Sequence, residues 1–192
     1  MSERIEFFYD VGSPYSYLAA TQVATLAADT GLPVVWRPIL LGGVFKGSGN
    51  QAPISVPSRG PYLAKDLLRC AKQLGVPFRM ASRFPLNTLL PMRVLAGTPD
   101  AALPETSLKL FRAYWFDDMD IASPEVVAGL LGAAAVAAAS DESVKQKLKA
   151  NSEEAVARGA FGAPTFFIGD EMFFGNDRIE LMKWWLQNRG KA

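Results

Sequence analysis

The residues with the clearest potential for chemistry lie in the run Gly12-Ser13-Pro14, shortly after the apolar segment Ile5 to Tyr9. A serine followed by a proline is typical of a helix N-cap and the first helical position. A helix that begins at Pro14 leaves its first amides without intrahelical acceptors, and these amides stabilise negative charge together with the helix dipole. We therefore expect an anion to be held beside Ser13.

The chemistry open to Ser13 is narrowed by two scarce residue types, because the sequence has no histidine and a single cysteine, Cys70. This excludes Ser-His-Asp catalysis, nearly every histidine-containing metal site, an internal disulfide and a thiolate metal cluster, and we expect no metal. Ser13 has no histidine to activate it as a nucleophile. Its expected role in chemistry is to donate a hydrogen bond to an anion that another molecule supplies. We expect that anion to be a cofactor thiolate.

The elements around this serine follow from the apolar pattern. The run Ile5 to Tyr9 predicts a buried strand, residues Pro14 to Thr30 predict a helix that ends at Gly31, and Pro33 to Ile39 predicts a second strand. This strand-helix-strand order has the length of a parallel right-handed crossover. The segment Leu41 to Pro61 is rich in Gly, Pro and Ser, which predicts a long loop, and loops of this length often carry function.

Residues 62–158 predict consecutive helices. Apolar residues recur at helical spacing at Leu63, Leu67, Cys70 and Leu74, and again at Leu108, Phe111 and Trp115. Ser123-Pro124-Glu125 predicts the cap of a further helix that reaches about Ala139, and another is expected from Asp141 to Arg158. A helical stretch of this length, between two segments with strands, predicts an insertion in a small α/β domain.

The C-terminal part again predicts strands. Pro164 to Ile168 and Glu171 to Phe174 flank the turn Gly169-Asp170, as in an antiparallel hairpin. Asn176 is expected to cap a last helix, whose inner face would carry Ile179, Met182 and Leu186. The order is therefore β-α-β, then helices, then β-β-α.

Four short motifs together resemble a known family: Ser13-Pro14-Tyr15-Ser16-Tyr17, Ser48-Gly49-Asn50, Gly162-Ala163-Pro164-Thr165 and Phe174-Gly175-Asn176-Asp177-Arg178. Over essentially the whole chain they are similar to 2-hydroxychromene-2-carboxylate isomerases and the related kappa-class glutathione transferases. The resemblance implies an α/β thioredoxin-like fold (β-α-β…β-β-α) with a large all-helical insertion. Residues 1–40 and 159–192 would form the thioredoxin-like domain, and 41–158 the loop and helical insertion subdomain.

The resemblance also implies roles for the residues around the first helix start. The run Ser13-Pro14-Tyr15-Ser16 stands where thioredoxins have two redox cysteines, so dithiol-disulfide exchange has no attacking group here. Ser13 would instead lie beside the sulfur of bound glutathione, whereas Ser16 is expected to be buried in the first turn. Ala163 would offer its backbone N–H and C=O to the cysteinyl part of glutathione, ahead of a cis Pro164.

The two ends of glutathione would be bound elsewhere. A helix start at Asn176 and Asp177 suits the ammonium and carboxylate of the γ-glutamyl group, with Asp177 facing the ammonium, although cap and dipole roles alone would explain both residues. Asn176 stands where kappa enzymes usually have serine. By resemblance Asn50 is a ligand of glutathione or substrate, and Arg59 would meet the glycyl carboxylate. Two other cations, Lys46 and Lys65, compete with Arg59 for that role.

Three other residues have mainly structural interpretations. Cys70 falls on an apolar helical stripe and is expected to be a small buried side chain, not a nucleophile. Trp115 is expected in the core, with a place in an aromatic substrate pocket as the alternative. Asn87 is expected to cap a helix, with a place in that pocket as the alternative.

Composition sets the remaining expectations. With 192 residues and a net charge of +1, the chain has no basic block for nucleic acid or a membrane surface. It begins Met1-Ser2-Glu3-Arg4-Ile5, which lacks the apolar core of a signal peptide, and no apolar stretch is long enough for a bilayer, so a cytoplasmic protein is expected.

The resemblance predicts a homodimeric, glutathione-dependent enzyme that converts 2-hydroxychromene-2-carboxylate to trans-o-hydroxybenzylidenepyruvate in aromatic catabolism. Two alternatives stay open. One is a kappa-like glutathione transferase or peroxidase that uses the same thiolate on other electrophiles. The other is a glutathione- or peptide-binding module that catalyses nothing.

Overall fold

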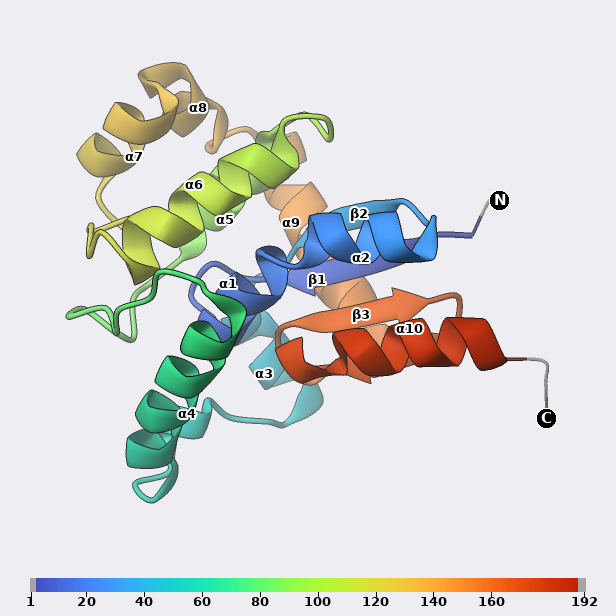
Figure 1. The fold of residues 1–192 in the computed structure, drawn as a ribbon. Coiled ribbons are helices and arrows are strands. Elements are labelled where there is room, and N and C mark those ends of the chain that lie inside the picture. Colours follow the sequence, from blue (N-terminus) through green and yellow to red (C-terminus); the bar gives the residue numbers. More distant parts are fainter. Residues whose placement is uncertain (1–2, 190–192) are drawn as a thin grey trace.

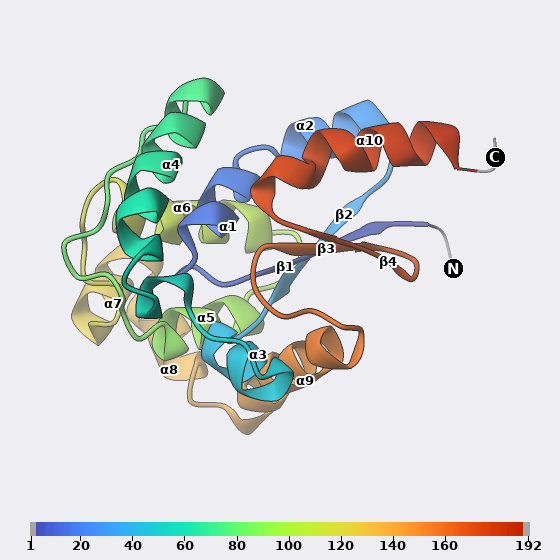
Figure 2. The same cartoon turned by 90° about the horizontal axis from the view of Figure 1, so that it is seen from below.

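A computed structural model describes residues 3–189 of the chain (Figure 1). Met1 and Ser2, used in the signal-peptide prediction, and residues 190–192 of the predicted thioredoxin-like domain lie outside this range. The described residues form an α/β structure, as predicted, and helices cover both faces of one mixed sheet (Figure 2). Among them, no helix is both long enough and apolar enough to cross a membrane.

The sheet has four strands in the order β2-β1-β3-β4. The strands are β1 (Ile5–Tyr9), β2 (Val34–Pro38), β3 (Thr165–Ile168) and β4 (Glu171–Phe174). β1 runs parallel to β2 and antiparallel to β3, and β3 and β4 form the predicted antiparallel hairpin. Since β1 lies in the middle of the sheet, its C-terminal end delivers the following residues, Asp10 to Ser13, to the centre of one edge of the sheet.

The helices are α1 (Pro14–Ala20), α2 (Val23–Thr30), α3 (Leu41–Ser48), α4 (Arg59–Leu74), α5 (Leu89–Gly97), α6 (Leu103–Trp115), α7 (Pro124–Leu131), α8 (Ala133–Ala138), α9 (Glu142–Ala157) and α10 (Ile179–Asn188). Two short 3₁₀ turns, η1 (Pro53–Ser55) and η2 (Asn176–Arg178), precede α4 and α10.

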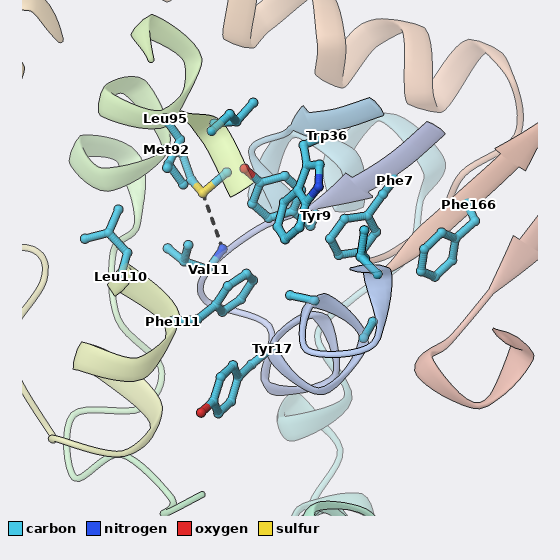
Figure 3. Close-up of a cluster of buried hydrophobic side chains, with 14 of the residues drawn as sticks. Phe7, Tyr9, Val11, Tyr17, Trp36, Met92, Leu95, Leu110, Phe111 and Phe166 are labelled. Atoms are coloured by element: carbon cyan, nitrogen blue, oxygen red, sulfur yellow. Dashed lines mark hydrogen bonds between the residues drawn. The ribbon is translucent and has the colours of Figure 1, made fainter. Parts of the chain in front are cut away.

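The larger core lies on the face of the sheet that α1, α2, α6 and α10 cover (Figures 1 and 3). All of β1 is buried, because helices cover both faces, and its odd-numbered residues point to this face. The ring of Phe7 stacks on Tyr9 and on Phe166, with centroids 5.0 and 4.9 Å away. The amide of Val11 then donates to the sulfur of Met92 on α5, so this core fixes the chain that leads to Ser13 (Figure 3).

The opposite face of the sheet packs on α3 and α9 (Figure 2). Phe8 and Phe167 meet edge to face at 5.5 Å, and the guanidinium of Arg158 lies 3.9 Å from the Phe167 ring centroid. The buried Glu6 carboxylate accepts hydrogen bonds of 2.8 Å from both Arg37 and Arg158. Burial alone would raise the pKa of Glu6, but these arginines outweigh it and hold that pKa below its usual range.

The predicted helix Pro14 to Thr30 is wrong in one respect, because it is divided into α1 and α2. The side chains of Thr21 and Gln22 both donate to the carbonyl of Leu18, at 2.8 and 3.0 Å. The backbone N–H of Gln22 donates to the Ala19 carbonyl, three residues earlier, and α1 ends after seven residues. The helix predicted to reach Ala139 is likewise divided, at Gly132, whose φ of 94° is outside the helical range.

The predicted loop Leu41 to Pro61 is also wrong, since it contains α3 and η1 and ends inside α4. The amide of Leu41 donates to the carboxylate of Asp10 at 2.8 Å, which caps α3 from a distant segment. Val44 is fully buried on the sheet. Gly47 lies so close to α9 that a Cβ there would be 3.2 Å from Val156. These tertiary contacts stabilise a helix that composition disfavours.

Other predictions are confirmed, with one shift of register. Asp141 is the N-cap of α9, and α6 contains Leu108, Phe111 and Trp115. Asn176 does not cap α10 but opens η2, so the helix itself begins three residues later, at Ile179. The division into a thioredoxin-like domain and a 41–158 subdomain stays a prediction, and α3 and α9 of that subdomain lie on the sheet.

Candidate functional site

A cavity of about 680 Å³ lies at the edge of the sheet where β1 ends. Its wall combines the start of α1, the segment from α3 to α4, the segment before α5, and the residues on both sides of the β3–β4 hairpin. Figure 2 shows the start of α10 beside α1, and η2 contacts α1 directly. Six of the seven predicted site residues line this cavity: Ser13, Asn50, Ala163, Pro164, Asn176 and Asp177. The structure does not place Arg59 there.

Ser13 is the N-cap of α1, as predicted, and is only 5% exposed. Its Oγ accepts the Ser16 amide at 3.1 Å and donates to the Ala163 carbonyl at 2.9 Å. Pro14 has no N–H. The amide of Tyr15 lies in the first turn of α1 and therefore has no intrahelical acceptor. Because α1 is shorter than predicted, these local donors, more than a long helix dipole, would stabilise an anion here.

The Ala163–Pro164 peptide bond is cis, as predicted, and lies directly before β3. The carbonyl of Pro164 accepts the Gly175 amide at 3.0 Å, which joins this segment to the residues before η2. Ala163 and Pro164 thus connect Ser13 on one side with Asn176 and Asp177 on the other. A second cis bond, Phe84–Pro85, which was not predicted, lies in the segment before α5 that also lines the cavity.

Asp10 is a buried carboxylate of the cavity wall that sequence reasoning missed. Its two oxygens accept the amides of Gly12, at 2.9 Å, and Leu41, at 2.8 Å. Burial raises the pKa of Asp10, against hydrogen bonds from Gly12, Leu41 and the Thr88 side chain. The carboxylate therefore ties the turn before Ser13 to the starts of α3 and α5. A carboxylate between a buried strand and a glycine was the signal available in the sequence.

The cavity wall also contains the consecutive residues Asn176, Asp177 and Arg178. The guanidinium of Arg178 lies 3.4 Å from the Asp177 carboxylate, and both side chains are about half exposed. A carboxylate, an amide side chain and a cation within one 3₁₀ turn match the ammonium and carboxylate of an amino-acid group. Arg178 belongs to a motif that the sequence analysis quoted, but no role was predicted for it.

The predicted ligands from residues 46–65 fall into two groups. Asn50 lines the cavity, and its side-chain amide donates to the Phe161 carbonyl at 2.8 Å, next to the Ala163 segment. Arg59 is the first residue of α4 and is exposed, and Lys46 and Lys65 are exposed too. These three cations are absent from the cavity wall, where Arg178 is present. A role for Arg59 in binding a carboxylate stays a prediction.

Cys70 packs against the cluster of Leu63, Leu67 and Ala71, as predicted, but it is half-buried and also lines the cavity, so the prediction of a buried side chain is wrong in that respect. The stripe on α4 buries Leu63, Leu67 and Ala71, and Cys70 lies at its edge. Its sulfur lies 3.9 Å from the Asp66 carboxylate. Burial first, and then the charges of Asp66 and Asp177, raise the pKa of the Cys70 thiol. A thiol in this setting is a poor nucleophile.

The phenol of Tyr15 adds a polar link across this wall. It donates to the Asp66 carboxylate at 2.6 Å and so joins α1 to α4. Burial first, and then Asp66, raise the pKa of Tyr15 above its usual value. The remaining wall is largely apolar, with Phe45, Phe84 and Leu86 among its members.

Three other residues follow their structural interpretations. Trp115 is fully buried in the core, where its indole N–H donates to the Val11 carbonyl at 2.8 Å. Asn87 accepts the Leu89 amide at 3.0 Å at the start of α5, one residue before the N-cap Thr88. Ser16 is fully buried in the first turn of α1, and its hydroxyl has no hydrogen-bond partner among residues 3–189.

The site therefore has hydrogen-bond donors beside Ser13, a backbone edge at Ala163 and a charged turn at η2 around one cavity. Its volume is in the range of cavities that bind drug-sized ligands. Over the part of the chain that the structure describes, no group of three or more His, Cys, Asp or Glu residues is placed to hold a metal ion. The donor set suits a small peptide that carries an anion near Ser13 and an amino-acid group near Asp177.

Comparison with known proteins agrees with this description. Residues 4–187 match the family model described as DSBA-like thioredoxin domain. The chain is 32% identical to glutathione S-transferase kappa 1 of Rattus norvegicus, with 95% of this chain and 90% of that protein covered. It is 29% identical to 2-hydroxychromene-2-carboxylate isomerase of Pseudomonas putida, with 93% and 92% covered.

A solved structure gives the same picture. The structure of 2-hydroxychromene-2-carboxylate isomerase superposes with a TM-score of 0.84 at 26% identity, over 96% of this chain and 94% of that one. The family match, the relatives and this structure together confirm the resemblance to 2-hydroxychromene-2-carboxylate isomerases and kappa-class glutathione transferases. The chain belongs to the DSBA-like thioredoxin domain family, which it shares with kappa-class glutathione transferases and 2-hydroxychromene-2-carboxylate isomerases.

Proposed function

We propose that the protein is a glutathione-dependent isomerase that converts 2-hydroxychromene-2-carboxylate to trans-o-hydroxybenzylidenepyruvate. The observation that carries this proposal is that Ser13, Ala163 with the cis Pro164, and Asn176 with Asp177 line one cavity. A tripeptide thiol has three groups to bind, namely a sulfur, a peptide backbone and an amino-acid end. The cavity offers a matching set of groups for each of them.

The residues of the chain have separate tasks in this proposal. Ser13 and the Tyr15 amide stabilise a negative sulfur, Ala163 binds the peptide backbone, and Asp177 pairs with the γ-glutamyl ammonium. The chemistry that glutathione supplies when bound is a nucleophilic sulfur that adds reversibly to a conjugated carbon and so lets the adjoining double bond rotate. The apolar wall with Phe84 and Leu86 would hold the aromatic ring of the substrate.

A second candidate is a kappa-like glutathione transferase or peroxidase. The chain is 32% identical to rat glutathione S-transferase kappa 1 and 29% identical to the Pseudomonas putida isomerase. The two identities are similar, so the transferase is also supported. The groups around Ser13 suit either reaction, because both require a stabilised thiolate. The difference would lie in whether glutathione is recovered.

The test is spectrophotometry of the purified protein with the chromene substrate and limiting glutathione. The isomerase proposal predicts many turnovers for each glutathione molecule, with the thiol recovered at the end. Stoichiometric loss of the thiol with an electrophile would support the transferase instead. Binding of glutathione without turnover of either substrate would support a non-catalytic binding module.

We also propose that the enzyme is cytoplasmic and homodimeric, as the sequence and the family resemblance lead us to expect. Size-exclusion chromatography with light scattering measures the mass in solution. A mass close to 20.8 kDa would contradict the dimer, because that is the mass of one chain.

A further inference from the structure

The hydroxyl hydrogen of Ser13 is already committed in this structure. Ser13 Oγ accepts the Ser16 amide at 3.1 Å and lies 2.9 Å from the Ala163 carbonyl oxygen. A carbonyl oxygen only accepts hydrogen bonds, so the hydroxyl must be the donor to it. The hydrogen that Ser13 would offer to a thiolate therefore points at Ala163.

This hydrogen bond joins two groups with different tasks in the proposed function. Ser13 is the residue that would stabilise the sulfur, and the Ala163 carbonyl would accept the cysteinyl N–H of glutathione. Both residues line the cavity, and they are 150 positions apart in the sequence. A carbonyl oxygen has two lone pairs, so a ligand N–H on the Ala163 carbonyl would share this acceptor with the Ser13 hydroxyl.

We propose that the Ser13–Ala163 hydrogen bond couples recognition of the glutathione backbone to activation of its sulfur. This inference rests on the proposed function and deepens it. When the cysteinyl N–H docks on the Ala163 carbonyl, the Ser13 hydroxyl turns away and donates to the sulfur. Rotation about the Cβ–Oγ bond moves only the hydrogen, so Oγ keeps the Ser16 amide and α1 keeps its cap.

The relative strengths of the hydrogen bonds favour this order of events. A second donor on the same carbonyl weakens the first bond, whereas a thiolate is a charged acceptor and forms a stronger bond than a neutral carbonyl does. The Ser13 hydrogen therefore moves most readily when the peptide N–H and the sulfur are both in place. A simple thiol has no peptide N–H to weaken the Ser13–Ala163 bond, so its sulfur gains less from Ser13, and the site favours peptide thiols by activating them more strongly.

The first test compares glutathione with an analogue in which an ester oxygen replaces the cysteinyl N–H. The thiol pKa of each bound ligand is measured from thiolate absorbance against pH, at saturating ligand. We expect the wild-type protein to lower the pKa of bound glutathione by about one unit more than that of the analogue. In Ser13→Ala this difference should disappear, and in Ser123→Ala, which removes another serine helix cap, it should stay.

If the wild-type protein lowered the thiol pKa of both ligands by the same amount relative to the free ligands, the coupling would be overturned. The same conclusion would follow if Ser13→Ala kept the full difference. If glutathione itself does not bind, the proposed function fails, and that outcome is distinct because no bound thiol is then observed.

A second test avoids any change in the ligand backbone and decides the matter if the ester analogue does not bind. S-methylglutathione keeps the cysteinyl N–H but cannot form a thiolate. We expect Ser13→Ala to tighten the binding of S-methylglutathione about twofold, because the Ala163 carbonyl loses a competing donor. The same variant should weaken the binding of glutathione about tenfold at a pH above the pKa of the free glutathione thiol, where the ligand is a thiolate. Calorimetry that shows unchanged or weaker binding of S-methylglutathione to Ser13→Ala would contradict the coupling.

Discussion

Two helices of this protein begin with the same two residues, α1 at Ser13-Pro14 and α7 at Ser123-Pro124. Both serines have extended backbone angles, with φ and ψ of −94° and 116° at Ser13 and −75° and 124° at Ser123. Each side chain accepts the amide three residues later, at 3.1 and 3.3 Å. As helix caps the two serines are equivalent.

Their hydroxyl hydrogens go to different places. Ser123 donates to the Glu125 carboxylate two residues away, at 2.6 Å and on an exposed surface. Ser13 donates across the cavity wall to the Ala163 carbonyl. The local sequence thus determines the cap, and the neighbour from a distant segment determines whether the serine takes part in a binding site.

The sharpest test of this difference replaces each serine in turn. We expect Ser13→Ala to lower glutathione-dependent turnover by roughly ten- to a thousandfold, the range for losing one donor to an anion, while retaining most of the glutathione affinity at neutral pH. Ser123→Ala should leave turnover unchanged. Both variants should lose about 1 kcal/mol of unfolding free energy as caps, measured by denaturant titration. Equal turnover in the two variants would remove the distinction.

The comparison extends to acidic residues near the starts of α10 and α7. We expect Asp177→Asn to weaken glutathione binding by about 1.5 to 3 kcal/mol, because the γ-glutamyl ammonium loses a charged partner. Glu125→Gln, in the first turn of α7, should not change the affinity. Titration calorimetry measures both, and unaltered binding by Asp177→Asn would reduce Asp177 to a structural role.

Replacing Cys70 tests whether the comparison between Ser13 and Ser123 is relevant to turnover at all. If the reacting sulfur belonged to the protein, the surroundings of Ser13 would not decide turnover. We expect Cys70→Ala to cost about 1 kcal/mol of stability, since the side chain is half-buried, and to keep turnover nearly intact. Wild-type protein freed of glutathione should be almost inactive. Full activity of that protein, with loss of activity in a folded Cys70→Ala, would show an internal nucleophile.

The smallest expected effect concerns the pKa of Glu125. The hydrogen bond from Ser123 lowers this pKa, so the interaction is fully present above the unfolded-state pKa and is lost as the pH falls through the folded-state value. In Ser123→Ala the pKa of Glu125 should rise toward its usual value, and in Ser13→Ala it should not move. Carbon-detected NMR titration of the carboxyl group measures both. A shift in Ser13→Ala would show that the two helix starts are not independent.

The sequence allowed most of the fold to be predicted, because the signals are local. The strand Ile5–Tyr9, the hairpin after Pro164 and the caps at Ser13 and Ser123 follow from apolar runs, turn residues and serine-proline pairs. The helix α3 could not be found in this way. Its cap comes from Asp10 and its packing partner is α9, so the signals that form it lie outside its own residues.

The same reasoning explains the outcome at the site. Six predicted residues line the cavity because the motifs that contain them have a recognisable pattern, whereas the choice of Arg59 depended on the segment that was taken to be a loop. Arg178 and Asp10 were missed, because their places in the cavity wall depend on the segments that fold around them. Cys70 lies next to the buried Ala71 on α4, so its side chain borders both the core and the cavity, and its partial exposure could not be predicted from the apolar spacing alone.

The hydrogen bond between Ser13 and Ala163 also bears on how the protein is made. Synthesis proceeds from the N-terminus, so Ser13 leaves the ribosome long before Ala163, its partner 150 residues later, has been added. Until then a nascent chain lacks the Ala163 carbonyl that Ser13 and a bound peptide would share. A resin that carries immobilised glutathione should therefore retain only nearly finished chains. Stalled chains that end before residue 160 should not bind to it.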